Sequence, residues 1–136
     1  MIKFQTSRFG ELEVKEDKII SFPSGLIGIP ELKECVLIDH KDTPLKWMQS
    51  IDDPDMAFIV AHPSVMVEEY SIDLDSRVKQ YLNLDKEDDL AVLVTIRVDG
   101  DDVIANFQGP ILVNSESMTG LQIVIDRPAE AYQKVV

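Results

Sequence analysis

The nine residues Leu90–Val98 and the turn that follows them constrain the fold of this chain more than any other stretch. Every second residue of the run is a large aliphatic side chain, which is the period of a β-strand with one buried face. The run leads into Asp99–Asp102, whose glycine and aspartates are typical of a tight hairpin turn. We therefore predict that Leu90–Val98 forms a hairpin with the next apolar run, Val103–Phe107.

Short apolar runs closed by turn residues recur along the rest of the chain. The segment Asp52–Asp55, which contains a proline, predicts a second hairpin between the runs on either side of it. Ser115–Gly120 is predicted to be a polar loop. Further strands are predicted around Phe4–Thr6 and Leu12–Val14 and over Ile19–Phe22, Cys35–Ile38, Leu45–Ile51, Met56–Ala61, Ile111–Asn114 and, as the last strand, Leu121–Ile125.

One helix is predicted over Ser76–Leu82, because Asp75 can cap its first turn and its apolar residues share one face. About nine short strands with one or two short helices predict a mainly β, antiparallel sandwich or barrel. A length of 136 residues is typical of one domain. We therefore expect a single domain over residues 1–136, with the tail after about residue 127 peripheral.

The formal charge of −12 is concentrated in the middle of the chain. Residues 51–102 carry 14 acidic and 4 basic side chains, a net charge of −10. This acidity argues against direct binding to nucleic acid, which requires clustered lysine and arginine. Two interpretations stay open: a solvated face that keeps the protein soluble, or an electronegative surface that faces a basic partner or repels nucleic acid.

Membrane insertion and secretion are not indicated by the apolar pattern. No apolar stretch approaches the ~18 residues that a membrane-spanning helix needs. Residues 1–10 alternate between polar and apolar and lack the continuous apolar centre of a signal peptide. We expect a cytoplasmic protein without a membrane partner.

Candidate catalytic and metal-binding patterns are weak. Ser76–Lys79 fits the S-x-x-K pattern of a serine nucleophile, but the start of a capped helix explains it better. The aspartate turns lack the spacing of a calcium-binding loop, and His40 and His62 lie in separate predicted loops. Cys35 lies in an apolar run and is typical of a small buried side chain. We expect no catalytic site, metal, cofactor or small-molecule substrate.

The loop Pro23–Pro30 contains two prolines and two glycines, which exclude a regular element, yet it carries Leu26, Ile27 and Ile29. Exposed loops are rarely so apolar. The loop is therefore expected either to pack across the end of a barrel or to form an apolar lip that binds a partner.

Five ordered segments carry a resemblance to a known family. They are Phe9-Gly10-Glu11; Ile20-Ser21-Phe22-Pro23-Ser24-Gly25-Leu26-Ile27-Gly28; Trp47-Met48-Gln49-Ser50-Ile51-Asp52-Asp53-Pro54, followed by Ala57-Phe58; Asn106-Phe107-Gln108-Gly109-Pro110-Ile111-Leu112-Val113-Asn114; and Gly120-Leu121-Gln122. In this order and over residues 1 to about 126, they resemble the flagellar assembly factor FliW family. The tail after Asp126 lacks the ending found in many members, and we assign it no role.

The resemblance implies an open β-barrel-like fold and a regulatory role with two protein partners. Members of the family bind flagellin, and they also bind the translational repressor CsrA, a basic RNA-binding homodimer. Binding of CsrA relieves its repression of flagellin mRNA, so the protein is expected to act as an anti-repressor. Flagellin competes for the family member, which links the synthesis of flagellin to its secretion.

Partner binding is expected at an apolar lip next to an acidic rim. The candidate residues are Phe22, Gly25, Leu26 and Ile27 in the lip, Trp47, Gln49 and Ile51 in the Trp47–Ile51 strand, and Asp52, Asp53, Asp55, Glu68 and Glu69 in the rim. Tryptophan is enriched among interface hot spots, but Trp47 is equally compatible with a place in the core. Asn106, Gln122 and Gly109-Pro110 are expected to be architectural.

Two other functions stay open at this point. One is a structural subunit of a larger assembly, which would self-associate through a long exposed strand edge. The other is a metal-assisted hydrolase that uses the aspartate clusters, although these fall in hydrated turns.

Overall fold

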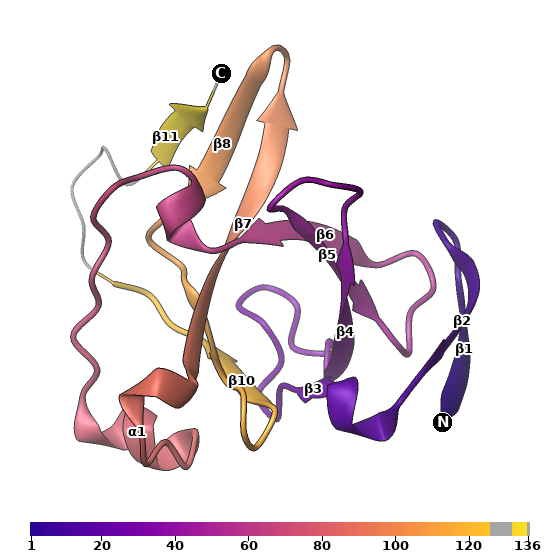
Figure 1. Cartoon of the computed structure of the whole chain (residues 1–136), viewed down its shortest axis with the longest axis horizontal. Coiled ribbons are helices and arrows are strands. Elements are labelled where there is room, and N and C mark those ends of the chain that lie inside the picture. Colours follow the sequence, from indigo (N-terminus) through magenta and orange to yellow (C-terminus); the bar gives the residue numbers. More distant parts are fainter. Residues whose placement is uncertain (126–131, 136) are drawn as a thin grey trace.

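The computed structural model describes residues 1–125 and the backbone of residues 132–135 (Figure 1). Strands dominate this part of the chain, which confirms the mainly β class. The strands are β1 (Ile2–Thr6), β2 (Gly10–Val14), β3 (Ile20–Ser21), β4 (Glu34–Asp39), β5 (Lys46–Ser50), β6 (Ala57–Ala61), β7 (Leu90–Asp99), β8 (Asp102–Asn106), β9 (Ile111–Asn114), β10 (Thr119–Gln122) and β11 (Tyr132–Val135). The helices are α1 (Ser76–Tyr81) and the short 3-10 turns η1 (Glu16–Lys18), η2 (Pro63–Val65) and η3 (Glu87–Asp89).

Seven of the strands form a barrel-like ring in the order β7-β6-β5-β4-β3-β10-β9, and β9 pairs back onto β7. Neighbours in the ring are antiparallel except β3 and β10, which meet in parallel at Ser21 and Thr119. Outside the ring, β8 continues from β7, and β11 continues from β8. Closing the sheet on itself removes most of its exposed edges. The predicted barrel-like architecture is therefore confirmed.

Strand β7 contacts three neighbours because it is long. Its first part, Leu90–Leu93, pairs with β9, the segment Val94–Ile96 pairs with β6, and Ile96–Asp99 pairs with β8. The predicted hairpin is present, with Gly100 in a left-handed conformation between the paired residues at its ends. Its outer half leaves the ring and projects from the body, as the upper part of Figure 1 shows.

A bulge separates β8 from β9, although both strands pair with β7. Between the pairs Leu93–Ile111 and Ile96–Ala105, β7 advances three residues while the opposite strand advances six. The extra residues include Gly109, where an added Cβ would lie 2.9 Å from the Asn106 side-chain nitrogen. This agrees with the architectural role predicted for the Gly-Pro segment, since a bulge bends its strand.

The helix α1 begins and ends at side chains that satisfy its free backbone groups. The Asp75 carboxylate accepts a hydrogen bond from the Val78 amide at 3.0 Å, as the sequence predicts. At the other end, the buried Asn114 amide donates to the Leu82 carbonyl at 2.8 Å, which ties the helix to β9. The Leu82 side chain is buried beneath this contact. No helix of the described residues is long and apolar enough to cross a membrane.

The core lies inside the ring, and a second contact attaches the N-terminal hairpin. The main cluster consists of Ile20, Phe22, Leu26, Leu32, Cys35, Met48, Val60, Leu93, Ile111 and Val113. Strands β1 and β2 form their own two-stranded sheet, which packs through Phe4 against Ile19 and Val36. Burial of the Cys35 thiol, followed by the charges of Asp52 and Glu34, raises its pKa to about 12. The thiol is therefore neutral and covered, as predicted for a small core residue.

Two predictions about the C-terminal third are wrong. Strand β10 begins at Thr119, inside the predicted polar loop, because its backbone pairs with β9. Leu121–Ile125 is not the last strand, since β11 follows and pairs with β8 over Tyr132–Val135. Strand β11 is the outermost strand of the nine-stranded sheet, and a peripheral tail stays a prediction. The remaining tail residues, 126–131 and 136, lie outside the described part.

Gly120 provides a test of ring packing. An added Cβ would lie 2.4 Å from the ring of the fully buried Phe22, so Gly120→Ala forces the ring out of place. We expect a loss of about 1–3 kcal/mol in the free energy of unfolding, measured by urea denaturation. Adding Phe22→Leu opens space, so the double variant should be more stable than the sum of the single changes. Strict additivity would contradict this packing.

Candidate protein-binding groove

The loop Pro23–Pro30 turns its apolar residues in two directions. Leu26 and Ile29 exchange backbone hydrogen bonds of 3.0 and 2.9 Å, which fold the loop into a tight turn. Gly25 permits this turn, because its φ is +70° and an added Cβ would lie 2.4 Å from the Pro30 carbonyl oxygen. The Leu26 side chain enters the core, whereas Ile27 is 56% exposed. The loop therefore packs inward through Leu26, whereas a partner-binding lip stays a prediction for which Ile27 is the exposed candidate.

A groove of about 560 Å³ opens between this loop and strands β6, β7 and β8. It is lined by Leu26, Ile27, Ile29, Phe58, Thr95, Ile96, Arg97, Ile104, Asn106 and Gln122. Six of these ten residues are aliphatic or aromatic, and only Arg97 is charged. A concave, mostly apolar site with a few polar groups is the usual form of a binding site.

The groove exists because β7 separates from β6. The two strands pair only from Val94 to Ile96, with Ile59 opposite Ile96. Continuing this register would place Phe58 opposite Arg97, but β7 has turned away into the projecting hairpin. Phe58 and Arg97 consequently face the opening from its two sides, and the loop Pro23–Pro30 supplies the remaining wall.

Gln122 fixes the loop against the bulge. Its side-chain oxygen accepts a hydrogen bond from the Ile27 amide at 2.9 Å, and its side-chain nitrogen donates to the Gly109 carbonyl at 2.9 Å. This hydrogen bond fixes the backbone that carries the exposed Ile27 side chain. The architectural role predicted for Gln122 has a concrete form here: it joins the loop to the segment between β8 and β9.

The predicted lip residues other than Ile27 are covered. Phe22 and Gln49 are 0% exposed, and Gly25 and Leu26 are buried. The Gln49 side chain donates to the Ser50 carbonyl at 2.9 Å and supports the turn after β5. Phe22, Gly25 and Gln49 form the loop and the turn after β5 from inside, whereas the largely buried Leu26 still contributes to the lining of the groove. The sequence suggested a surface role for these residues, but in the structure they pack in the interior.

Trp47 lies half-buried at a junction between two hairpins. The Arg8 guanidinium lies 4.1 Å from the centre of its ring, and Phe9 meets it edge-on at 6.1 Å between ring centres. The indole nitrogen donates to His40 Nδ1 at 3.2 Å. Trp47 therefore connects the β1–β2 turn to β5 and to His40 after β4. Ile51 packs against a different cluster, formed by Phe4, Ile19 and Val36. Neither residue lines the groove.

The predicted acidic rim is exposed but does not line the groove. Asp52, Asp53 and Asp55 occupy the turn between β5 and β6, where Asp53 accepts the Asp55 amide at 3.0 Å. Glu68 and Glu69 follow η2 and are also exposed. The structure does not bring these five carboxylates into the groove, whose charge is positive. Sequence reasoning missed Arg97 and Phe58, because in a strand pattern they look like ordinary alternating residues.

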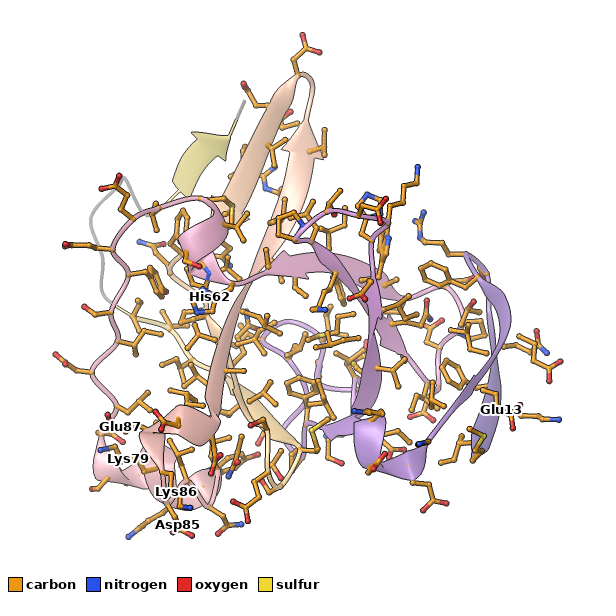
Figure 2. All side chains as sticks on the ribbon, in the orientation of Figure 1. Glu13, His62, Lys79, Asp85, Lys86 and Glu87 are labelled. Atoms are coloured by element: carbon orange, nitrogen blue, oxygen red, sulfur yellow. The ribbon has the colours of Figure 1, made fainter. Side chains whose placement is uncertain are left out.

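Other charged side chains lie at the periphery. Figure 2 shows Lys79, Asp85, Lys86 and Glu87 around α1, with Glu13 pointing outward from the N-terminal hairpin at the opposite side. His62 is engaged by Ser64, whose amide donates to its Nδ1 at 3.1 Å. Among the described residues, no three histidine, cysteine, aspartate or glutamate side chains are grouped so that they could hold a metal ion.

Comparison with known proteins places this architecture in a family. The model of the FliW protein family matches residues 3–135. The chain belongs to the FliW family. The flagellar assembly factor FliW of Caldanaerobacter subterraneus subsp. tengcongensis is 33% identical over 129 residues, covering 92% of this chain and 86% of the relative. That of Leptospira interrogans is 36% identical over 127 residues, covering 90% and 85%.

A solved structure supports the same assignment. The crystal structure of a flagellar assembly factor FliW superposes with a TM-score of 0.87 and 32% identity, covering 98% of this chain and 94% of the other. The segments that carried the resemblance have structural roles in this FliW-family chain. Gly25 and Gly120 permit close contacts, Asn114 caps the helix end, and Gln122 holds the loop. These segments therefore identify the fold more directly than the partner.

Replacing Gln122 tests the link between loop and bulge. Gln122→Leu removes both side-chain hydrogen bonds, so we expect faster hydrogen exchange at the Ile27 amide and a loss of about 1–2 kcal/mol in unfolding free energy. Exchange is measured by two-dimensional NMR. The control is Gln80→Leu on the exposed side of α1, which should leave the Ile27 amide unchanged. Equal protection of that amide in both variants would contradict the assigned link.

Proposed function

We propose that the protein is a cytoplasmic assembly factor that acts by binding proteins, and that its partners are flagellin and a CsrA-like translational repressor. The relatives in its family are named flagellar assembly factors, which places the protein in flagellum biogenesis. The observation that carries the proposal is the open groove, whose apolar walls continue onto the exposed Ile27. Such a surface fits a segment of another protein.

The acidic surface suits the second partner. Residues 51–102 carry a net charge of −10, and the five carboxylates of the predicted rim are all exposed. A repressor that binds RNA presents basic residues, to which such a surface is complementary. Complementary charge of this kind increases association rate and specificity more than affinity. The repulsion of RNA phosphate would extend over about one Debye length, ~8 Å at physiological salt.

The proposed regulation follows from these two interactions. Free protein binds the repressor and releases flagellin mRNA for translation. Newly made flagellin occupies the protein, so the repressor is set free again. Translation of flagellin would then follow its consumption by secretion. The protein acts through equilibrium binding and needs no catalytic step, cofactor or small-molecule substrate.

Pull-down from the lysate of a motile bacterium tests the proposal. We expect the tagged protein to retain flagellin and a CsrA-like repressor, identified by mass spectrometry. Added purified flagellin should reduce the retained repressor. A tagged chain unfolded by Gly120→Ala combined with heat serves as the control for non-specific retention. Recovery of neither partner would overturn the proposed function.

Neutralising the rim tests the contribution of charge. The variant Asp52→Asn, Asp53→Asn, Asp55→Asn, Glu68→Gln and Glu69→Gln should release repressor-bound RNA less effectively in a gel-shift titration. The matched control neutralises five exposed carboxylates elsewhere, Glu11, Glu13, Glu16, Asp17 and Glu31, with the same change in net charge. High salt should reduce the difference between the two variants. Equal activity of both at low salt would contradict a local role of the rim.

A further inference from the structure

The charge of the groove is opposite to that of the protein. Arg97 is the only charged residue that lines it, in a chain with a formal charge of −12. Within residues 1–125 its guanidinium forms no ion pair. Among the described residues only Lys46 and Asp39 form an ion pair, so what distinguishes Arg97 is its position as the single charged side chain in a mostly apolar groove.

We propose that the groove binds an apolar protein segment that carries a carboxylate, and that Arg97 binds this carboxylate. The inference rests on the proposed function, in which flagellin and a basic repressor are the partners. The repressor is the poorer match, because its basic surface would meet a like charge at Arg97. We therefore assign the groove to flagellin and expect the occupying segment to be apolar with one acidic group.

The chemistry of the walls determines what Arg97 can contribute. Arginine binds a carboxylate through two parallel N–H donors, which fixes the orientation of the bound group. Phe58, Ile104 and Ile27 line the same groove, and their apolar side chains would limit the access of water to such a pair. A pair at the edge of an apolar site is stronger than one in open water, since the local dielectric constant is lower. Because Arg97 is itself exposed, its contribution should also depend on salt.

The apolar surface continues beyond the groove along the chain that follows β10. The amides of Ile123 and Ile125 donate to Pro110 and Gln108 at 3.1 and 2.9 Å, so this segment stays extended after the strand ends. Alternation then places Val124 on the same side as Gln122, which lines the groove. Val124 is 73% exposed. A bound segment longer than the groove would therefore contact Ile27 and Val124 on the way out.

Charge reversal at Arg97 tests the assignment with full-length protein and purified monomeric flagellin. We expect Arg97→Glu to weaken flagellin binding about tenfold at 50 mM salt, measured by isothermal titration calorimetry, and by less at 500 mM. Arg77→Glu on α1 is the matched control, because it changes the net charge equally at an exposed site outside the groove. It should weaken binding less than twofold. Equal effects of the two reversals would overturn the inference.

A second pair of variants tests the apolar wall. Ile27→Ser should weaken flagellin binding about tenfold, whereas Val65→Ser, which removes a similar side chain exposed elsewhere, should change it less than twofold. Hydrogen exchange of the complex should protect the amides of residues 26–29 and 95–104. Protection confined to other segments, or equal effects of both serine variants, would also overturn the inference.

These outcomes separate the inference from the function on which it rests. If the unchanged protein binds no flagellin, the proposed function itself fails. If it binds flagellin and Arg97→Glu binds as tightly as Arg77→Glu, only the assignment of the groove fails. The variant Ile27→Ser should bind the repressor as tightly as the unchanged protein does. Loss of repressor binding in this variant would contradict the assignment of the groove to flagellin alone.

Discussion

The pairing of β7 with two different partners along one edge is the constraint on which the rest of the structure depends. Its first residues close the ring against β9, and its last residues carry β8 away from the ring. The bulge before Ile111 makes both pairings possible, because it inserts extra residues between β8 and β9, opposite Leu93–Ile96 of β7. The pairing of β7 with β6 ends at Ile96, where its pairing with β8 begins. The groove is therefore a consequence of how the ring closes.

Local patterns in the sequence were sufficient for the elements whose partners are close in the chain. The hairpins at Asp52–Asp55 and Asp99–Asp102 and the helix capped by Asp75 depend on turn geometry and short-range hydrogen bonds. Residue spacing alone determines such contacts. The ring is different, because it closes through pairs such as Ser21 with Thr119 and Leu93 with Ile111. Nothing in either segment specifies its distant partner, so the strand pattern left a sandwich and a barrel both open, and the family resemblance favoured the barrel-like fold.

The candidate site was predicted in part, for the same physical reason. An apolar loop next to glycines correctly indicated where the groove begins, and Ile27 is its exposed member. The sequence could not show which loop residues turn inward, because that depends on the close contact of Gly25 with Pro30. Arg97 was missed because its neighbours in space, Phe58 and Ile104, come from other strands. Acidic residues are numerous between positions 51 and 102, but their density in the sequence does not show which surface they occupy.

The position of the only tryptophan has a practical consequence. Trp47 is enclosed by Arg8, Phe9 and His40 at the junction with the N-terminal hairpin, and it does not line the groove. Its emission spectrum should therefore report whether that hairpin is docked, while staying nearly silent when the groove is filled. Trp47 fluorescence is therefore an intrinsic probe of the surface where the N-terminal hairpin docks. A ligand that changes this fluorescence would have to affect the hairpin, either by direct contact or through the neighbouring strands.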